Sequence, residues 1–294
     1  MSIDNICVVG VGLIGGSFSS AIKKAGFAGT ITGVVRDEAK GKIAVERGVV
    51  DFATTDIASA AAKSDLVMLA VPMLSMRAQL ETMAPVLQSH TIVTDAGSVK
   101  QPFINDARAT LPYLNRVVPG HPIAGKEKSG LDAVDANLYK DHRILLTPLP
   151  ETDAEAVANV GELWESTGGI VESLSPEHHD EALAATSHLP HVLAFAMVDM
   201  LASRQEMKEM FRYSAGGFRD FTRIASGESI MWRDICMTNQ MSVVKAIEEF
   251  EAHLSVIKQA ITDGDAETVE TVFRRARAAR EEHIEARVEQ IELK

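Results

Sequence analysis

The 294-residue chain is poor in three features, and each scarcity excludes a class of protein. Its two cysteines, Cys7 and Cys236, are too few for a disulfide framework or a cysteine-based metal site. No apolar run is long enough to span a bilayer, and the first predicted strand begins so near Met1 that we expect no signal peptide and a cytoplasmic protein. The 29 basic residues are outnumbered by 41 acidic ones, and the net charge of −12 argues against nucleic acids and anionic membranes as partners.

The glycine-rich segment near the N-terminus predicts a bound dinucleotide. Residues 6–9 are apolar and indicate a short buried strand, which includes Cys7, and an apolar helical pattern begins after the turn. Between them lies the spacing G-x-G-x-x-G, in the strand–turn–helix context that this fingerprint requires. The first glycine permits the tight turn, the second lets the backbone approach a pyrophosphate, and the third lets the helix pack closely on the strand. We therefore predict NAD or NADP as the cofactor, with its pyrophosphate at the helix N-terminus. The residues expected to contact it here are Gly10, Gly12, Leu13, Ile14 and Gly15.

The two halves of the chain differ in predicted structure. The first half alternates strand-like and helix-like segments, which is typical of a mostly parallel sheet covered by helices. From about residue 175 onward almost no strand signal is seen. We predict an α/β Rossmann-type N-terminal domain, residues 1–174, and an all-α C-terminal dimerisation and substrate domain, residues 175–294. The predicted strands are residues 6–9, 30–35, 65–71, 91–95, 116–119 and 143–148, with 168–174 at the sheet edge.

The predicted helices of the second half carry much apolar surface. Residues 180–204 are apolar on several sides, and Pro190 is expected to kink or restart that helix. Apolar residues at every third or fourth position from Val244 to Ile261 predict a long amphipathic helix, and residues 266–292 predict another. We expect the excess apolar surface to lie in a homodimer interface, although a self-sufficient monomeric bundle fits the same pattern.

Four further clusters contain residue types suited to chemistry. They are residues 95–100 (DAGSVK), 120–125 (GHPIAG), 187–191 (SHLPH) and 216–223 (GGFRDFTR), the last followed by Trp232. The first two follow predicted strands, and ligands of open α/β sheets gather at the carboxyl ends of strands. A histidine at such a place, His121, can transfer protons near neutral pH. Behind a dinucleotide turn, the clusters together predict a hydride-transfer site that holds a small anion.

Each cluster also has a simpler interpretation. Ser98 after a strand fits a helix N-cap, and His121 before a proline fits a turn residue. His188 fits a packing or solvent-facing histidine. Arg219 and Arg223 fit surface partners of Asp220, a kind of pair that contributes little stability.

Six motifs of the chain resemble those of the prephenate/arogenate (cyclohexadienyl) dehydrogenase family of tyrosine biosynthesis. They are GVGLIGGS, DAGSVK, GHPIAGKEKSG, SHLPH, GGFRDFTRIA and MWRDI, in family order across nearly the whole chain. The resemblance implies a Rossmann domain, a helical dimerisation domain and an active site between them. It also implies oxidative decarboxylation of prephenate to 4-hydroxyphenylpyruvate, or of arogenate to tyrosine, with hydride transfer to NAD or NADP.

The resemblance implies a role for individual residues as well. His121 matches the base that accepts the ring-hydroxyl proton, Ser98 matches the serine that orients it, and Arg223 matches the arginine that binds the ring carboxylate. Glu127 matches a gating acidic residue near the pocket mouth, and no metal is needed. The other residues implied for the substrate pocket are Ser187, His191, Gly216, Asp220 and Trp232, some of them across the dimer.

The end of the second strand departs from the usual pattern of NAD-binding proteins. Such proteins place an acidic residue there to bind the ribose hydroxyl, whereas Val35 occupies this position, followed by Arg36 and Asp37. Arg36 favours NADP, because a guanidinium can bind the 2′-phosphate. Asp37 would favour NAD if its side chain turned inward. At the end of a later strand, Asp95 is also expected among the cofactor-binding residues.

Two other functions remain open from the residues alone. A β-hydroxyacid dehydrogenase shares the Rossmann-plus-helical plan but needs a catalytic lysine, for which Lys245 and Lys258 lack a recognisable motif. A non-catalytic, dinucleotide-sensing dimer would leave His121 and Arg223 without a shared purpose. Among the two family substrates, prephenate is favoured, because an amine would want a nearby carboxylate and residues 187–191 offer none.

Overall fold

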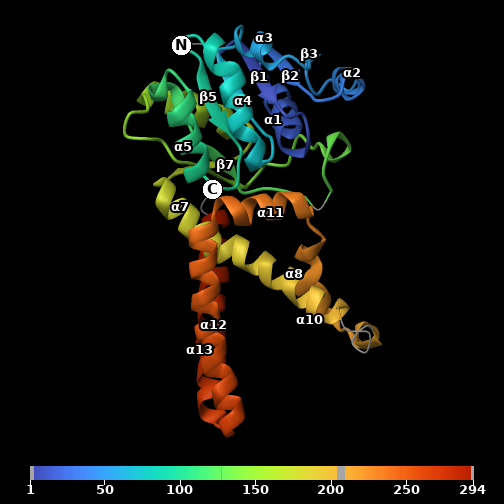
Figure 1. Cartoon of the computed structure of the whole chain (residues 1–294), viewed down its shortest axis with the longest axis vertical. Helices are drawn as coiled ribbons and strands as arrows, with labels where there is room; N and C mark the ends of the chain where they lie inside the picture. The colour runs from blue at the N-terminus through green and yellow to red at the C-terminus, as the bar shows by residue number, and fades with distance from the viewer. Residues whose placement is uncertain (1–2, 127, 204–208, 293–294) are drawn as a thin grey trace. The chain divides into compact units, whose positions relative to one another are not determined.

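A computed structural model describes residues 3–126, 128–203 and 209–292 (Figure 1). The chain divides into two compact units, Met1–Val243 and Val244–Lys294. Over the residues so described, no helix is both long and apolar enough to cross a membrane.

A six-stranded parallel sheet forms the centre of the first unit, with the strand order β3-β2-β1-β4-β5-β6. This is the strand order of the dinucleotide-binding Rossmann fold, so the predicted fold class is confirmed. The central strands are buried because helices cover both faces of the sheet (Figure 1). The strands are β1 Asn5–Val9, β2 Thr30–Val34, β3 Phe52–Thr54, β4 Leu66–Leu69, β5 Ile92–Asp95 and β6 Val117–Val118.

The core of this unit lies on both faces of the sheet. Alternate residues of β1 supply the two sides: Cys7 and Val9 join one apolar cluster, and Ile6 and Val8 join the other. Cys7 is fully buried, as predicted. The helices that flank the strands are α1 Leu13–Lys24, α2 Glu38–Glu46, α3 Ile57–Ala61, α4 Met76–Met83, α5 Gln101–Thr110 and α6 Ala154–Ser166. Short 3₁₀ turns are η1 Met73–Ser75, η2 Ala84–Val86, η3 Leu114–Arg116, η4 Leu131–Ala133 and η6 Glu209–Tyr213.

A second, three-stranded sheet corrects the prediction of a single sheet. It contains β7 Gly120–Pro122, β8 Arg143–Leu146 and β9 Ile170–Ser173, with β7 antiparallel to β8. Residues 143–148 and 168–174 were expected to extend the first sheet. The chain instead leaves β6 at Pro119, which has no amide hydrogen to continue a ladder, and reverses its pairing at β7. Residue His121 is therefore the central residue of a short strand in the second sheet.

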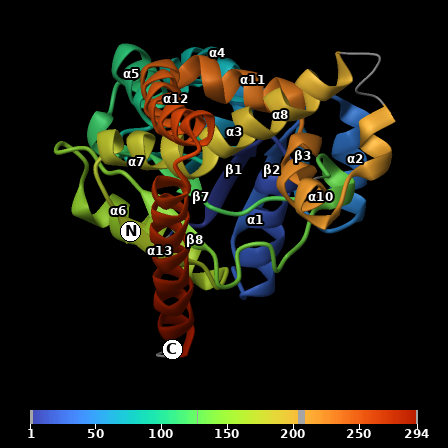
Figure 2. The same cartoon turned by 90° about the horizontal axis from the view of Figure 1, so that it is seen from below.

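The first two helices after the second sheet, α7 and α8, are joined by an irregular turn. A π-helical turn, η5 Ala184–His188, joins α7 Pro176–Leu183 to α8 Leu189–Ala202. Pro190 lies in the first turn of α8, directly after the π turn, so the helix changes its hydrogen-bonding pattern there without ending. The following elements are α10 Gly216–Thr222, η7 Arg223–Ser226 and α11 Ser229–Thr238. Seen from below, α7, α8 and α11 cross beneath the parallel sheet (Figure 2).

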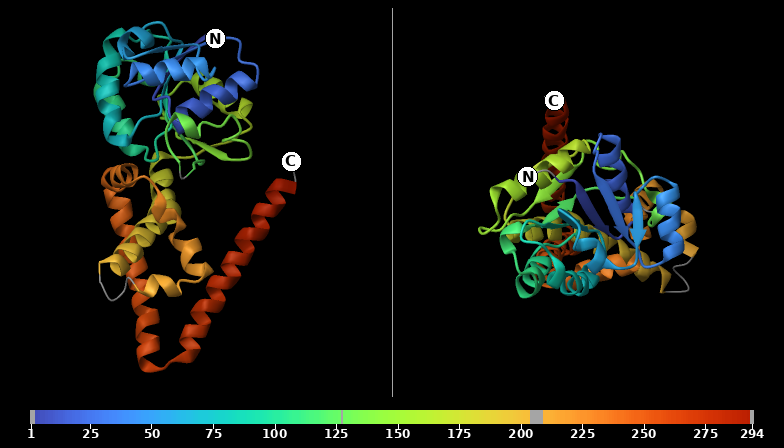
Figure 3. Two further views of the ribbon diagram at one scale, coloured as in Figure 1. Left: turned by 90° about the vertical axis from the view of Figure 1, so that its right-hand side faces the viewer. Right: turned by 90° about the horizontal axis from the view of Figure 1, so that it is seen from above.

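The second unit is a helical hairpin whose two helices diverge from the turn between them (Figure 3). Helix α12, Gln240–Asp263, begins in the first unit, and α13 spans Ala266–Glu292 (Figure 3). Between them Gly264 takes the left-handed conformation, with φ of 70°. The amide of Asp265 donates to the carbonyl of Ala260 at 2.9 Å, and the amide of Gly264 donates to Ile261 at 3.3 Å. These two bonds form the Schellman ending of α12, and both predicted long helices are confirmed.

Candidate active site

The glycine turn between β1 and α1 has the shape that a dinucleotide needs. Gly10 has φ of +97°, and a Cβ there would lie 2.4 Å from the carbonyl oxygen of Ala70. A Cβ on Gly15 would lie 2.3 Å from the carbonyl oxygen of Gly10, so helix and strand pack closely there. A Cβ on Gly12 would meet nothing within 4 Å, so a ligand has room to approach that backbone. The turn therefore fits a bound pyrophosphate.

The N-terminus of α1 is open to an anion. Its N-cap is Gly12, which supplies no side-chain hydrogen bond, and its first turn contains no acidic residue. The amides of Leu13 and Ile14 lie in that first turn. Unpaired amides at a helix N-terminus attract negative charge, as a pyrophosphate requires.

At the end of β2, the two candidate ribose contacts differ in their present partners. The carboxylate of Asp37 accepts from the amide of Ala39 at 2.8 Å and caps α2. Arg36 is exposed. Asp37 would have to give up its cap to bind a ribose hydroxyl, whereas the exposed guanidinium has no such bond to break.

The backbone of His121 is fixed by a buried ion pair. Lys100 and Asp95 are both fully buried and bind each other. The Asp95 carboxylate also accepts from the amide of Gly120 at 3.1 Å, and the Lys100 ammonium donates to the carbonyl of Gly120 at 2.5 Å. The Asp95 carboxylate also accepts from the amide of Gly97 at 2.8 Å. Asp95, a predicted cofactor contact, therefore has both carboxylate oxygens bound within the protein, where they position the strand that carries His121.

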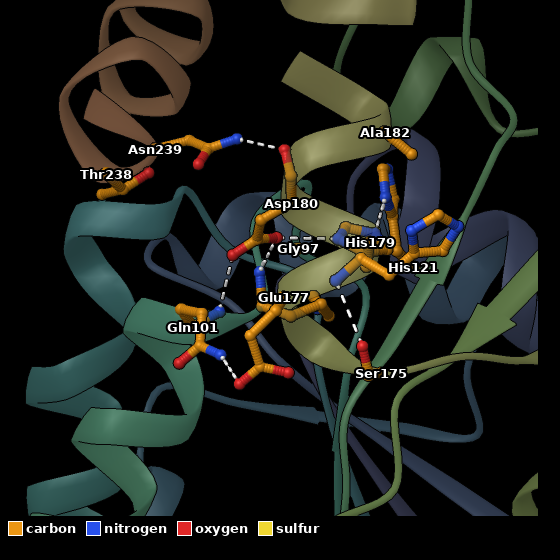
Figure 4. Close-up of polar contacts among 12 residues, drawn as sticks. Gly97, Gln101, His121, Ser175, Glu177, His179, Asp180, Ala182, Thr238 and Asn239 are labelled. Carbon is orange, nitrogen blue, oxygen red and sulfur yellow. Dashed lines mark hydrogen bonds and ion pairs between the residues drawn. The ribbon is translucent and has the colours of Figure 1, made fainter. Parts of the chain in front are cut away.

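The His121 imidazole is buried and lies in a chain of three side chains. His121 Nδ1 is 2.9 Å from His179 Nε2, and His179 Nδ1 is 2.7 Å from Asp180 Oδ1 (Figure 4). The same carboxylate accepts from the backbone amides of Lys100 at 2.8 Å and Gln101 at 2.9 Å. Asp180 therefore caps the start of α5, and the alternative in which Ser98 caps this helix is wrong.

Neither His179 nor Asp180 was identified from the sequence. Both belong to α7, 58 residues or more beyond His121, and Asp180 contacts residues about 80 positions earlier. The only local signal was the pair of adjacent histidines, His178 and His179, of which the first is exposed and the second buried.

Burial and neighbouring charges keep the imidazoles of His121 and His179 neutral near pH 7. Burial, the adjacent His179, Lys100 and His188 hold the pKa of His121 well below its usual range. Burial also lowers the pKa of His179, although its bond to Asp180 opposes that shift. An uncharged His121 has a free lone pair, which a general base needs.

A second group of predicted pocket residues lies on the helices that follow α7: Ser187 on the π turn, His191 on α8 and Trp232 on α11. His191 Nδ1 lies 2.8 Å from the carbonyl oxygen of Ser187, so these two residues share a helix face across Pro190. The imidazole of His191 stacks on the indole of Trp232, with ring centroids 3.5 Å apart and planes 20° apart. The Trp232 ring also packs tightly against Gly227, where a Cβ would lie 2.4 Å from Nε1.

His188 behaves as a packing residue, which was its simpler interpretation. It is 1% exposed, and its Nδ1 lies 3.3 Å from the side-chain nitrogen of Asn239. Burial lowers its pKa from 6.5 to about 4.

The remaining predicted residues are placed as follows. Ser98 is half-buried just after β5, on the same connection as Lys100. Gly216 and Asp220 lie on α10, and Arg223 begins the next turn, η7, which packs against α8. Burial lowers the pKa of His191, and the charge of Arg223 lowers it further. Glu127 lies outside the described residues.

Two domain profiles match the chain. The prephenate dehydrogenase nucleotide-binding domain matches residues 18–173, and the prephenate dehydrogenase dimerization domain matches residues 175–275. The chain belongs to the prephenate dehydrogenase family. Membership confirms the resemblance carried by the motifs, and it decides against a β-hydroxyacid dehydrogenase and a non-catalytic dinucleotide sensor. The protein is an NAD(P)-dependent oxidoreductase of the prephenate/arogenate dehydrogenase type.

Individual members of the family are similar over nearly the whole chain. Cyclohexadienyl dehydrogenase of Zymomonas mobilis is 38% identical over 283 residues, which cover 94% of each protein. Prephenate dehydrogenase of Bacillus subtilis is 33% identical over 95% of this chain and 76% of the relative. The crystal structure of Aquifex aeolicus prephenate dehydrogenase with hydroxyphenyl propionate and NAD+ superposes with a TM-score of 0.90 at 40% identity, covering 96% of this chain and 99% of that one. Synechocystis arogenate dehydrogenase gives 0.82 at 28% identity, with 95% and 99% covered.

Proposed function

We propose that the chain oxidises prephenate, with His121 as the base that takes the proton from the hydroxyl on ring C4. The observation that carries this proposal is a buried, neutral imidazole held beside the dinucleotide-binding sheet by its hydrogen bond to His179. Loss of that proton favours departure of hydride from the same carbon. The bound nicotinamide dinucleotide supplies the hydride acceptor. Loss of the ring carboxylate as carbon dioxide then leaves a phenolate, to which His121 returns the proton.

Arg223 is proposed to bind the ring carboxylate of the substrate. A planar guanidinium can grip a carboxylate with two hydrogen bonds, and no covalent chemistry is needed from it. The charge of Arg223 acts on His191, which stacks on Trp232, and all three are proposed to line the pocket with Ser187, Gly216 and Asp220. Its task is to orient ring C4, and Ser98 is proposed to help orient His121.

Prephenate is proposed over arogenate, because the pocket segment from Ser187 to His191 contains no carboxylate for an ammonium group. The test is the rate of nicotinamide reduction with each substrate and with a 3-hydroxy acid. We expect the greatest catalytic efficiency with prephenate. Faster turnover of arogenate would overturn the substrate choice, and turnover of the 3-hydroxy acid alone would overturn the proposed reaction.

NADP is proposed to be accepted alongside NAD. Arg36 is exposed at the end of β2, while the nearest carboxylate, Asp37, is bound to its own helix. A guanidinium in that place can bind the 2′-phosphate. The ratio of catalytic efficiencies with the two cofactors should shift toward NAD in Arg36→Ala. A wild-type enzyme that strongly prefers NAD, with a ratio unchanged by the substitution, would contradict this assignment.

A homodimer is proposed as the working form. The supporting observations are the match to the family's dimerization domain and the exposure of large apolar side chains in the second unit. These side chains are Val244, Phe250, Leu254, Val256, Ile261 and Phe273. The functional domains are proposed to meet at residues 174 and 175, although the first compact unit extends to Val243. Light scattering should give twice the chain mass of 31.8 kDa at micromolar concentration, and a monomer would contradict the dimer.

A further inference from the structure

The contacts of His179 and Asp180 fix more than the place of His121. Asp180 is nearly fully buried, and its carboxylate accepts from two backbone amides at the start of α5, those of Lys100 and Gln101. Both oxygens of this carboxylate therefore already act as acceptors. Asp180 also accepts from His179 Nδ1, so that nitrogen carries a hydrogen.

This arrangement determines the state of the next ring. A neutral His179 with hydrogen on Nδ1 presents a bare lone pair at Nε2, 2.9 Å from His121 Nδ1. The bond between the two rings then requires hydrogen on His121 Nδ1. The second nitrogen of His121, Nε2, is then left without hydrogen. Figure 4 shows His121 and His179 side by side.

We propose that His179 and Asp180 are positioning residues that hold His121 in the tautomer with a bare Nε2, so that Nε2 is the atom that receives the substrate proton. The inference rests on the proposed role of His121 as the base. When Nε2 takes the proton, the charge on His121 is shared through the Nδ1 hydrogen bond with His179, which lies against the Asp180 carboxylate. The relay formed by His121, His179 and Asp180 consumes no proton overall, because the proton returns to the product oxygen.

Other charged groups around the relay oppose or support the charge that forms. Lys100, from the connection after β5, and His188, on the π turn, disfavour a positive His121. Asp180, on α7, and Asp95, at the end of β5, favour a positive His179. The carboxylate of Asp180 is the one bonded directly to the relay, so its removal should have the largest effect on turnover.

The direct test is the protonation of His121 in the wild-type enzyme. Nitrogen-15 NMR of the histidine-labelled protein at pH 7.5 distinguishes a hydrogen-bearing from a bare ring nitrogen, and His121→Asn identifies the His121 signals by their loss. We expect hydrogen on Nδ1 and a bare Nε2. Hydrogen on Nε2 in the wild type would overturn the inference, whatever the variants do.

Three variants test the relay by kinetics. Asp180→Asn can donate to His179 Nδ1 and so reverse both tautomers, and we expect kcat to fall by about a hundredfold or more, the contribution of a correctly positioned general base. His179→Asn keeps a donor toward Asp180 but removes the acceptor for His121, and should lower kcat about tenfold or more. His179→Gln restores an acceptor at that place and should recover most of the loss. KM for prephenate and cofactor affinity should change little in all three.

The matched control is His178→Gln, which alters the exposed neighbouring histidine of α7 and should leave kcat unchanged. If His179 had a merely structural role, His179→Asn and His179→Gln would lose similar activity. The low-pH side of the plot of kcat/KM against pH would also stay where it is in the wild type. That result would overturn the inference. The proposed function fails separately, if His121→Asn keeps full turnover. If a variant does not fold, the wild-type NMR measurement still decides.

Discussion

At the scale of single residues, the site depends on side chains that burial keeps uncharged. His121 is a base because its surroundings disfavour the imidazolium form before substrate arrives, and a bonded neighbour fixes its ring. Its place could be predicted, because GHPIAG follows a strand in the sequence. Its partners His179 and Asp180 could not, because a contact across 58 residues leaves no local pattern.

The substitution His121→Asn should abolish most turnover. Asparagine keeps one hydrogen bond toward His179 but cannot accept a proton at neutral pH, so we expect kcat to fall on the order of a hundredfold or more. Substrate affinity should change far less. Steady-state reduction of the nicotinamide measures both, with His178→Asn as a control on an exposed imidazole. Unchanged turnover at pH 7 would remove His121 from the mechanism.

The substitution Arg223→Ala should mainly weaken substrate binding. Loss of a charged hydrogen-bond donor to a carboxylate costs about 1.5–3 kcal/mol, or roughly a ten- to hundredfold rise in KM for prephenate. Cofactor affinity should hold. Arg219→Ala, which changes the exposed arginine of α10, is the matched control. If prephenate saturates both variants equally well, Arg223 does not bind the carboxylate.

At the scale of elements, the parallel strands were predictable and the second sheet was not. Strands β1, β2, β4 and β5 lie within a few residues of their predicted positions, because buried apolar runs between helices have a clear pattern. Strand β7 has only three residues, one of them a proline, so no alternation can reveal it. The short edge strand β3, Phe52–Thr54, was missed for the same reason.

Substitutions at two glycines of the turn should separate an effect on stability from an effect on cofactor binding. In Gly15→Ala the new methyl group would lie 2.3 Å from a carbonyl oxygen, so the helix must move, at a cost of about 1–3 kcal/mol and several degrees in Tm. In Gly12→Ala the methyl group meets nothing within 4 Å, so Tm should hold while affinity for the dinucleotide falls roughly tenfold or more. Thermal unfolding without ligand and cofactor titration check the pair. Equal cofactor affinity in Gly12→Ala and wild type would place the pyrophosphate elsewhere.

At the scale of the whole molecule, the helices of the second half could be predicted, but not which of them pack with the sheet and which form the second unit. The pattern predicted the two long helices and an irregularity near Pro190, because helical periodicity survives in the sequence. It did not show that α7–α11 form one compact unit with the sheet as far as Val243, since that depends on contacts such as Asp180 with the start of α5. The same packing buries several histidines, and this has a consequence for stability.

Stability of the enzyme should fall as pH decreases below about 6.5. Folding lowers the pKa of His121, His179, His188 and His191, chiefly through burial, so the unfolded chain binds protons that the folded chain does not. Stability from such groups is complete above the unfolded pKa of 6.5, and it is lost as pH falls through the window down to each folded pKa. For His188, whose folded pKa is about 4, the loss amounts to about 3 kcal/mol by pH 4.

Urea unfolding of His188→Gln and wild type between pH 7.5 and 4.5 isolates the contribution of His188 to this loss of stability. Near pH 5 the slope of the unfolding free energy against pH should be smaller in the variant by about 1.2 kcal/mol per pH unit. His178→Gln, exposed on α7, should keep the wild-type slope. Identical slopes in all three proteins would mean that His188 is protonated in the folded enzyme, against its burial.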